Sequence, residues 1–383
     1  MTIRITKTAF TVLLVLAMSS SAFASSSEVI NSFAFNTARI LGQDGGSYFF
    51  SPYSIVSAFG MAYAGASGDT AAEIEQSLGF TPELHGELAE LTRSLQDGQY
   101  ISSANRVWMR TGLNLSREYQ DKLLMYYGSR AKALDIKRKP EASRKEINDW
   151  VSKKTGGRIT NLLPSLDPST QMIITNAVYF KANWQHKFSK SLTAPEKFRD
   201  GGKVTEVPMM KKNEDLQYAE IDGVKIVRLP YEGRRMSMFV VLPPEARPDA
   251  LDGLNAETFR QWVGSMRKYD VDLWLPKFRT EESYQLADVF KALGVTRAFS
   301  DTADFSGITE DTALKVDAVI HKTFIDVDEE KTEAAAATGI AMVGATMMPD
   351  PTPKAEFHAD HPFTYFIADT YTGTILFMGR QTF

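Results

Sequence analysis

The sequence predicts an α+β fold in which helices dominate the first part of the chain and antiparallel strands the rest. Apolar residues recur at helical spacing up to about residue 155, whereas runs typical of strands follow from residue 172. The 359 residues after position 24 exceed the usual size of one domain, which favours two. However, no Gly/Ser-rich or Pro-rich linker divides the chain, and no internal repeat is visible. We therefore expect one interwoven unit.

The first 24 residues have the pattern of a secretory signal peptide. Arg4 and Lys7 precede an apolar run from Ala9 to Met18, and residues 22–24 (AFA) form a small-x-small cleavage site. The apolar run is too short for a membrane-spanning helix, and no later run is long enough. We expect an exported protein without a membrane anchor, extracellular or periplasmic, whose mature part is 25–383.

Composition and charge indicate a soluble globular protein. Of its residues 43% are hydrophobic and 23% are charged, and a formal net charge of −4 gives no support to nucleic acid as a partner. The chain contains no cysteine, which excludes disulfides, thiol nucleophiles and thiolate metal sites. One basic cluster, KRKPEASRK at residues 137–145, is interpreted as a solvated approach to a helix rather than as a polyanion site.

Two long helices are predicted from the spacing of apolar residues. Residues 51–66 and 143–157 each place apolar side chains on one stripe, and the second segment stops at a Gly-Gly pair. The second helix should lie on the surface with one face buried. The stripes consist of Ile55, Phe59 and Ala62 in the first segment, and of Ile147, Trp150 and Val151 in the second.

Strand patterns follow these helices. Residues 172–180 form a nearly unbroken apolar run, which suits a strand covered on both faces. Residues 227–243 predict a hairpin that turns at Glu232-Gly233, and residues 271–276 alternate apolar and polar side chains. The runs 363–368 and 374–379 are expected to pair across a turn at 371–373. Antiparallel sheet should therefore build most of the second half.

A catalytic function has little support in the sequence. Ser67, in GASGD at residues 65–69, is a candidate hydrolase nucleophile, but the segment is better interpreted as a turn between two helices. The second of these helices would open with a capping box at Thr70 and Glu73 and end at Gly79. Phosphate-binding, dinucleotide-binding and nucleophile-elbow motifs are absent. We expect no catalytic residues and no cofactor.

The pair His358-x-x-His361 is a weak candidate for metal binding. In an extended segment, residues three apart face opposite sides of the chain, so the two rings could not share an ion without a turn. No metal site is therefore expected.

The segment 332–349, TEAAAATGIAMVGATMMP, is unusual for a loop. It carries no charge from Ala334 to Pro349, and with a period of two its residues divide into an uncharged set and a set containing Glu333. These properties predict a strand with a buried face. Yet 27 residues, 330–356, separate the neighbouring strand-like runs, which is long for a connection. The segment therefore suggests a loop with two native locations.

Eight segments in order make the chain resemble the serpin family, and together they cover about residues 31–383. They are FFSPYSIVSAFGMAYAGASGDTAAEI, INDWVSKKTGGRITNLLP, TNAVYFKANW, VRLPYEG, LPKF, ALGVTRAFSDTADFSGI, VIHKTFIDVDEEKTEAAAAT and FHADHPFTYFI…ILFMGR. The resemblance implies one domain of about nine helices and three β-sheets, with an exposed reactive-centre loop at about 330–356. It overrules the expectation of two domains.

The resemblance also implies a function, that of a suicide inhibitor of serine proteases. The protease cleaves the loop and forms an acyl-enzyme, after which the freed loop inserts into the main sheet as a new strand and traps the protease. The implied partner is a serine protease in a covalent complex. The inhibitor itself is expected to be a monomer without a cofactor.

The family pattern assigns residues to two regions of this mechanism. A hinge comprises Glu329, Lys331, Thr332, Glu333, Ala334, Ala335, Ala336 and Ala337, and the short side chains of its four alanines suit insertion between strands. A polar cluster under the sheet, which must part to admit the strand, comprises Ser51, Ser54, Asn176 and His321, with Trp184 near the entry point. Many inhibitory serpins have glycine where this chain has Lys331, and a lysine there could slow hinge movement.

Counting from Glu329 by the usual hinge-to-cleavage distance places the cut at Ala345-Thr346. Counting back from the following strand places it at Met347-Met348, where Pro349 follows and disfavours cleavage. Small apolar residues imply elastase-like or subtilisin-like targets. Two alternatives stay open: a non-inhibitory serpin with a carrier, chaperone or storage role, and a serine hydrolase that uses Ser67.

Overall fold

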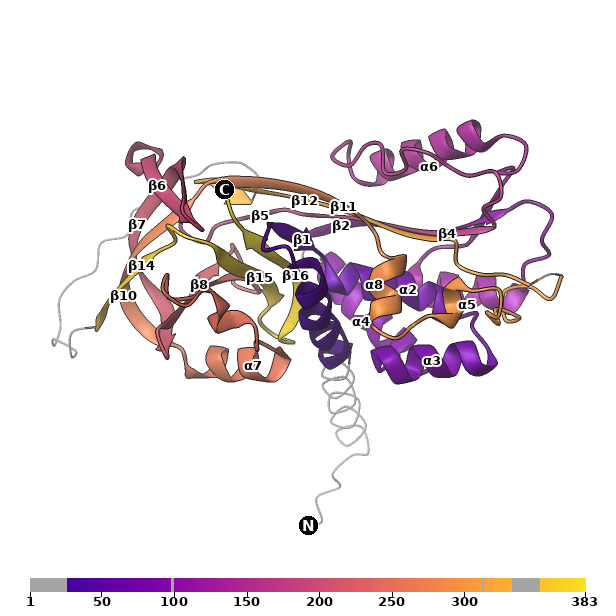
Figure 1. Cartoon of the computed structure of the whole chain (residues 1–383), viewed down its shortest axis with the longest axis horizontal. Helices are drawn as coiled ribbons and strands as arrows, with labels where there is room; N and C mark the ends of the chain where they lie inside the picture. Colours follow the sequence, from indigo (N-terminus) through magenta and orange to yellow (C-terminus); the bar gives the residue numbers. More distant parts are fainter. Residues whose placement is uncertain (1–25, 98–99, 312, 333–351) are drawn as a thin grey trace, which may run out of the picture.

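The structure is a computed structural model, and it describes residues 26–97, 100–311, 313–332 and 352–383. A five-stranded sheet runs along the long axis of the molecule (Figure 1). Most helices lie beneath one half of this sheet, and a second, strongly curved sheet occupies the other half. The predicted signal peptide and most of the predicted reactive-centre loop lie outside the described residues.

Eight α-helices and three short 3-10 helices occur among the described residues. The first helix covers residues 26–41. The others are α2 (Pro52–Tyr63), α3 (Gly68–Leu78), α4 (Leu84–Asp97), α5 (Arg117–Tyr127), α6 (Pro140–Lys154), α7 (Ala256–Ser265), α8 (Ala287–Ala292), η1 (Lys190–Leu192), η2 (Pro248–Leu251) and η3 (Arg297–Phe299).

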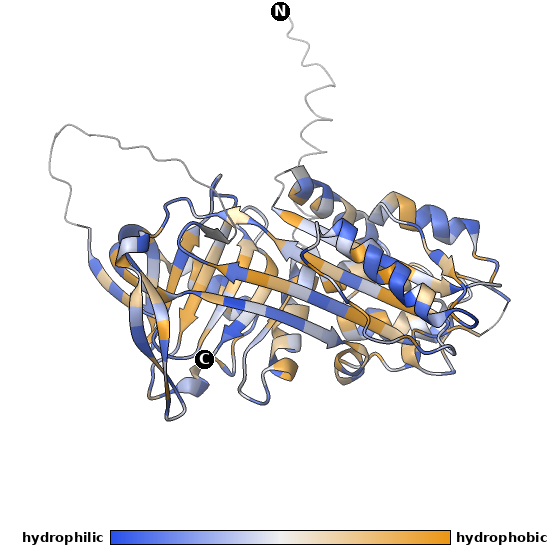
Figure 2. Cartoon of the chain, turned by 90° about the horizontal axis from the view of Figure 1, so that it is seen from above, coloured by the Kyte–Doolittle hydropathy of each residue, from blue (hydrophilic) through white to orange (hydrophobic). Residues whose placement is uncertain are grey.

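The five-stranded sheet has the order β11-β12-β4-β2-β3. Its strands are β2 (Ile101–Arg110), β3 (Lys132–Leu134), β4 (Met172–Phe180), β11 (Phe278–Gln285) and β12 (Ala318–Val327). The predicted strand 172–180 is β4, and all of its residues are buried. Helix α2 packs against one face of this sheet, and α6 lies across the other (Figure 2). Because both faces are covered, β4 is apolar along nearly its whole length.

The nine-stranded sheet has the order β1-β16-β15-β9-β8-β7-β10-β14, with β6 paired to β7. A third, two-stranded sheet joins β13 to β5. The strands are β1 (Tyr48–Phe50), β5 (Ala182–Asn183), β6 (Ala194–Asp200), β7 (Lys203–Ile221), β8 (Val224–Pro230), β9 (Met236–Leu242), β10 (Arg267–Pro276), β13 (Lys331–Thr332), β14 (Lys354–His358), β15 (Phe363–Asp369) and β16 (Thr374–Gln381).

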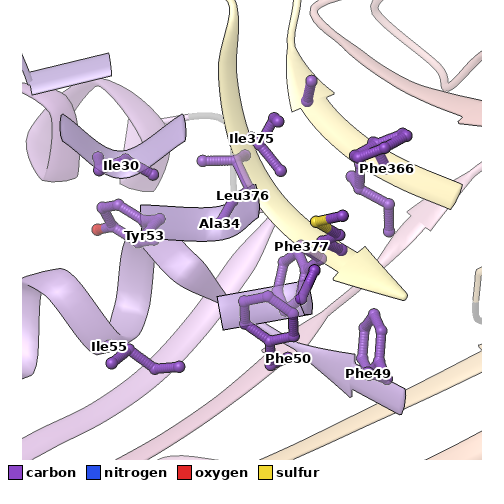
Figure 3. Packing of buried hydrophobic residues seen from close by; sticks show 14 of the residues in the cluster. Ile30, Ala34, Phe49, Phe50, Tyr53, Ile55, Phe366, Ile375, Leu376 and Phe377 are labelled. Atoms are coloured by element: carbon purple, nitrogen blue, oxygen red, sulfur yellow. The ribbon is translucent and has the colours of Figure 1, made fainter. Parts of the chain in front are cut away.

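The core joins the first helices to the last strands of the chain. Figure 3 shows Ile375, Leu376 and Phe377 of β16 packed beside the helix at 26–41, α2 and β1. Phe49 stacks on Phe377 with ring centroids 5.6 Å apart, and both rings are fully buried. The two ends of the chain therefore share one hydrophobic core, which explains why the sequence contains no domain boundary.

Most predicted elements are confirmed, and one local prediction is wrong. The helix predicted at 143–157 is α6, with Ile147 and Val151 buried, and the hairpin turn at Glu232-Gly233 joins β8 to β9. Gly79 ends α3 in the left-handed conformation, as expected. The capping box is wrong because Ser67 is the residue that precedes α3. Glu73 instead accepts hydrogen bonds from the backbone of Thr296, 2.8 Å away, at the start of η3.

Candidate functional site

The candidate site is the seam between β4 and β12, the two central strands of the five-stranded sheet. These strands are parallel, and Ala318–Phe324 pairs with Ile173–Tyr179. Beyond the end of β12 the chain turns back, so that Lys331 and Thr332 pair antiparallel with Asn183 and Ala182. A strand that continues in this direction would be antiparallel to both β4 and β12. The fold therefore directs the chain after β12 toward the seam.

A row of polar residues crosses the middle of the seam. His321 lies opposite Asn176, and Asn176 lies opposite Asn105 on β2. The side-chain amide of Asn176 donates to Asn105 Oδ1 at 2.6 Å, to the carbonyl oxygen of Ser54 at 3.0 Å and to the hydroxyl of Ser54. Asn176, His321 and Ser54 are fully buried. Hydrogen bonds thus replace apolar packing at this level of the seam.

The hydrogen bonds of His321 define its tautomer. The backbone N–H of Ser51 donates to His321 Nε2 at 3.2 Å, so Nε2 is an acceptor and the proton must reside on Nδ1. Nδ1 then donates to the side-chain oxygen of Asn176. Burial lowers the pKa of His321 to about 3. The ring is therefore neutral at physiological pH, and protonation would remove the acceptor that Ser51 requires.

Ser51 connects this row to the core strand β16. Its hydroxyl donates to the carbonyl oxygen of Leu376 at 2.7 Å and accepts from the backbone N–H of Ser54 at 3.2 Å, which caps α2. The structure thus brings together the four predicted residues Ser51, Ser54, Asn176 and His321. A movement of β12 away from β4 would have to break the bond between His321 and Asn176.

A second cluster lies where β12 ends. Glu329 is 4% exposed, and its carboxylate accepts from Lys277 Nζ at 2.7 Å and from Thr193 Oγ1 at 2.8 Å. Burial alone would raise the pKa of Glu329. The hydrogen bonds from Lys277, from the backbone and from Thr193 outweigh it and hold the pKa below its usual value. Glu329 is therefore charged and paired.

Trp184 belongs to this second cluster and not to the polar row. Its indole Nε1 donates to the carbonyl oxygen of Asp328 at 2.9 Å, and its backbone N–H donates to the carbonyl oxygen of Glu330 at 3.3 Å. The ring stacks on Tyr231 with centroids 4.6 Å apart. Trp184 therefore holds the chain just before Lys331, at the place where the hinge begins.

Other predicted site residues fall outside these two clusters. Lys331 and Thr332 are described by their backbone pairing with Asn183 and Ala182. Glu333, Ala334, Ala335, Ala336 and Ala337 lie outside the described residues, as do the predicted cleavage positions Ala345, Thr346, Met347 and Met348.

The remaining candidates for chemistry have structural partners. Ser67 precedes α3, and its backbone N–H donates to the carbonyl oxygen of Asp304 at 3.0 Å. His358 contacts Glu196, whereas His361 contacts Asp360, so the two rings do not share a partner. Within the described ranges, no three metal-binding side chains gather in one place, and no helix has the length and apolar character to cross a bilayer.

Sequence reasoning missed Lys277, Thr193 and Asn105, which complete the two clusters. Each comes from a different strand or turn and stands in no local motif. The one available signal was Glu329 itself, because a carboxylate at the end of a buried strand requires a cation. Nothing in the sequence indicated which lysine supplies it.

The described chain turns back beyond the end of β12, beside the seam between the parallel strands β4 and β12. A family model described as serpin (serine protease inhibitor) matches residues 28–382. An uncharacterized serpin-like protein of Thermococcus kodakarensis is 40% identical over 360 residues, covering 92% of this chain and 84% of the relative. A leukocyte elastase inhibitor of Bos taurus is 37% identical over 352 residues, covering 88% and 92%. The chain belongs to the serpin family.

Solved structures agree with this assignment. A tumour-suppressing serpin superposes with a TM-score of 0.84 at 29% identity, covering 94% of this chain and 99% of that one. Uncleaved ovalbumin superposes with a TM-score of 0.83 at 27% identity, covering 93% and 98%. The predicted serpin fold is therefore confirmed, and it forms one domain.

Proposed function

We propose that this serpin is a secreted suicide inhibitor of serine proteases whose cleaved loop inserts between β4 and β12. The observation that carries the proposal is the pairing of the hinge. Lys331 and Thr332 lie antiparallel to Asn183 and Ala182, just past the end of β4. A chain that continues in this direction can hydrogen bond to β4 on one side and to β12 on the other.

The register of the hinge gives each loop residue a partner on β4 if the same ladder continues. Ala336 falls opposite Val178, and Thr338 falls opposite Asn176. Small side chains would thus enter the apolar upper part of the seam. The hydroxyl of Thr338 would arrive at the buried polar row, where His321 donates a hydrogen bond to Asn176. The loop sequence fits the seam level by level, which supports insertion.

The same register accounts for the one acidic residue of the inserting segment. Glu333 falls opposite Lys181, which is exposed. Thr332 falls opposite Ala182, which is 7% exposed and packs in the main core. Insertion would therefore leave the carboxylate of Glu333 in solvent beside a cation, so its charge need not be desolvated. Lys331 falls opposite the partly exposed Asn183, so a lysine there is compatible with insertion.

The proposed reaction begins as ordinary proteolysis. The serine Oγ of the protease attacks the carbonyl carbon of Ala345, and the bond from that carbon to the nitrogen of Thr346 breaks. The nitrogen leaves as an amine after taking a proton from the protease histidine, and Ala345 stays attached to the protease as an ester. The freed segment then inserts before water hydrolyses the ester, and the displaced protease loses its catalytic geometry.

Several features support an elastase-like or subtilisin-like target and an exported inhibitor. No basic residue that would suit a trypsin-like pocket lies between Ala334 and Pro349. A relative of similar length is named as a leukocyte elastase inhibitor. Residues 1–24 would direct export out of the cell or into a periplasm and would then be removed. The working form is proposed to be a monomer that needs no cofactor.

A carrier role is the second candidate. A human thyroxine-binding globulin in complex with its hormone superposes on this chain with a TM-score of 0.84 at 28% identity. The fold is therefore compatible with a function in ligand binding. The run of small uncharged residues at 334–337 favours the inhibitor over the carrier, because a carrier has no need for a segment that can enter a sheet.

Incubation with proteases distinguishes the two candidates. The protein is mixed with elastase or subtilisin, and the products are separated on denaturing gels while the released C-terminal peptide is sequenced. We expect a covalent complex, loss of protease activity and a peptide that begins at Thr346. Cleavage of the loop without a complex would contradict inhibition and favour the carrier.

A matched pair of variants tests the register. Thr332→Arg should turn the inhibitor into a substrate, because the guanidinium would have to enter the core beside Ala182. Glu333→Arg places the same side chain one residue later, on the exposed face, and should keep trapping within about threefold, since a like charge beside Lys181 costs less than about 1 kcal/mol there. Equal behaviour of the two variants would refute the proposed register.

A further inference from the structure

Two histidines hold β14, the strand that follows the reactive-centre loop. In the described part of the nine-stranded sheet β14 is an edge strand and pairs only with β10. At its last residue, His358 Nε2 lies 3.1 Å from Glu196 Oε2, and the ring lies 5.2 Å from the ring of Trp274. Glu196 is also paired with Lys211. Contacts of side chains therefore supplement a ladder that is incomplete on one side.

His361 has an acceptor at each ring nitrogen. Nε2 lies 2.7 Å from the carbonyl oxygen of Pro243, and Nδ1 lies 2.9 Å from Asp360 Oδ1. Neither oxygen can donate if Asp360 is ionised, so both ring nitrogens must carry hydrogen for both bonds to form. The contacts therefore select the imidazolium form. The other carboxylate oxygen of Asp360 is paired with Arg199, whose backbone N–H donates to the carbonyl oxygen of Asp360 at 2.8 Å.

The charges around His361 favour this form. Asp360 contacts His361 from within the same segment, the link between β14 and β15. Arg199 of β6 contacts Asp360, and Glu245 lies in the segment after β9. Burial opposes the charge, but Asp360, the carbonyl of Pro243 and Glu245 together raise the pKa of His361. Burial likewise opposes ionisation of Asp360, but His361 and Arg199 lower its pKa to about 2. Asp200 and Arg380 line a surface pocket that His361 also lines.

The length of the loop makes this anchor important. The 21 residues between Thr332 and Lys354 can reach at most about 75 Å. An uncut loop that inserts fully beside the nine residues of β4 must run about 30 Å along that strand, away from the hinge. It must then return about 30 Å to the hinge end of the sheet. Little length remains to cross from the seam to β14. Insertion without cleavage would therefore pull on β14, and any contact that holds β14 opposes it.

We propose that the chain of contacts from His361 through Asp360 to Arg199 is a pH-sensitive anchor that keeps the uncut loop out of the sheet. The inference rests on the proposed function, because it requires a loop that can insert. When His361 loses a proton, the ring can keep only one of its two hydrogen bonds. Asp360 keeps its contacts with Arg199 of β6. The bridge from Asp360 through His361 to the carbonyl oxygen of Pro243 is broken at one of its two bonds, so the link between β14 and β15 is held less firmly to the segment after β9 and β14 separates more easily from β10.

The test follows spontaneous conversion of the full-length protein in the absence of protease. Samples are held at about pH 6, where His361 is protonated, and at about pH 9, well above the usual histidine pKa of about 6.5. At intervals we would measure the fraction that resists thermal unfolding and verify by mass spectrometry that the chain is uncut. We expect conversion at least about tenfold faster at the higher pH. Equal rates at the two pH values would overturn the proposal.

Two substitutions at one position sharpen this test. His361→Gln cannot serve both acceptors and should convert quickly at both pH values, whereas His361→Lys keeps a cationic donor and should convert slowly at both. If the Gln variant converts no faster than the native protein at about pH 6, the anchor is refuted. Asp288→Asn is the control, because it removes an exposed ion pair with Lys291 on α8, and it should leave the rates unchanged.

A second sample, cut within the loop by subtilisin, distinguishes failure of the anchor from failure of the proposed inhibitor function. If the cut protein gains heat resistance but the uncut protein converts independently of pH, only the anchor is wrong. If even the cut protein gains no heat resistance, the loop does not insert and the proposed function itself fails.

Discussion

The outer end and the middle of the β4–β12 seam are held by different chemistry. Where β12 ends, the ionised Glu329 is held by Lys277, whose side chain is 34% exposed and can retreat into water. In the middle, His321 and Asn176 form a neutral pair that is fully buried. Opening the outer end breaks the hydrogen bonds from Trp184 to Asp328 and Glu330, which are only partly buried, so water can replace them and the ion pair can stay intact. Separating the inner pair leaves buried donors without acceptors. The seam is therefore easiest to open from the hinge end.

The largest effect is expected in the buried row. Asn176→Ala removes the acceptor of His321 Nδ1–H, and the other tautomer would deprive the backbone N–H of Ser51 of its acceptor. The folded state should lose about 3 kcal/mol, because one buried donor stays unsatisfied and a small cavity forms. Urea unfolding of native and variant protein measures the difference.

Asn105→Ala is the matched control for that substitution. Asn105 is the same residue type in the same row, but it is only partly buried and accepts a single bond from Asn176. Asn176 keeps its contacts with Ser54, so the loss should be at most about 1 kcal/mol. Equal losses for the two variants would mean that the position in the row does not matter.

The ion pair at the outer end should contribute less. Glu329→Gln keeps the shape of the side chain but removes the charge that Lys277 faces, and we expect a loss of about 2 kcal/mol. Hydrogen exchange should accelerate first at the backbone N–H groups of Trp184 and Phe188, which donate to Glu330 and Glu329. In the double variant with Lys277→Met the loss should shrink, because no cation remains unpaired. Unchanged exchange there would contradict opening from this end.

The inner row also predicts that the stability of the fold depends on pH near neutrality, a range in which the outer ion pair has no effect. Burial lowers the pKa of His321 to about 3, and burial with the nearby Lys122 lowers that of His85 to about 4. Below about pH 6.5 the unfolded chain binds protons that the folded chain rejects, so stability is complete above this pH and falls below it. Each histidine can remove up to about 1.4 kcal/mol per pH unit.

Urea midpoints at about pH 7 and about pH 5.5 measure this effect, and His85→Gln isolates the share of His321. The lowered pKa of Glu329 acts at lower pH, because its usual value is 4.5. His361 acts in the opposite direction and in another window, since its raised pKa gives stability that is lost as the pH rises above about 6.5. A midpoint in the His85→Gln variant that does not change with pH would contradict a neutral His321.

The sequence predicted the elements well and the clusters only in part, for physical reasons. Residues 172–180 read as a buried strand because apolar side chains on both faces leave a local signal, and β4 is fully buried. The capping box failed because Glu73 has a better partner far away in sequence, the backbone of Thr296. Local patterns cannot reveal such long-range competition.

The polar row was reached through the family resemblance and not through local pattern. Ser54 and Asn176 are far apart in sequence, and a buried asparagine within an apolar run indicates only that some partner exists. The cation for Glu329 was not predicted, because many lysines precede it and only the fold selects Lys277. The register of β13 on β5, on which the proposed function depends, likewise follows only from three-dimensional structure.

The smallest expected effect concerns Trp184, which separates packing from hydrogen bonding at the outer end. Trp184→Phe keeps an aromatic ring to stack on Tyr231 but removes the N–H that donates to the carbonyl oxygen of Asp328. The loss in stability should be about 1 kcal/mol, because the carbonyl lies near the surface end of the seam and can accept from water. Exchange at the backbone of Trp184 should rise, while the urea midpoint should move less than in Glu329→Gln. If it moves more, aromatic packing rather than the ion pair closes the outer end, and the contrast between a charged end and a neutral middle would have to be abandoned.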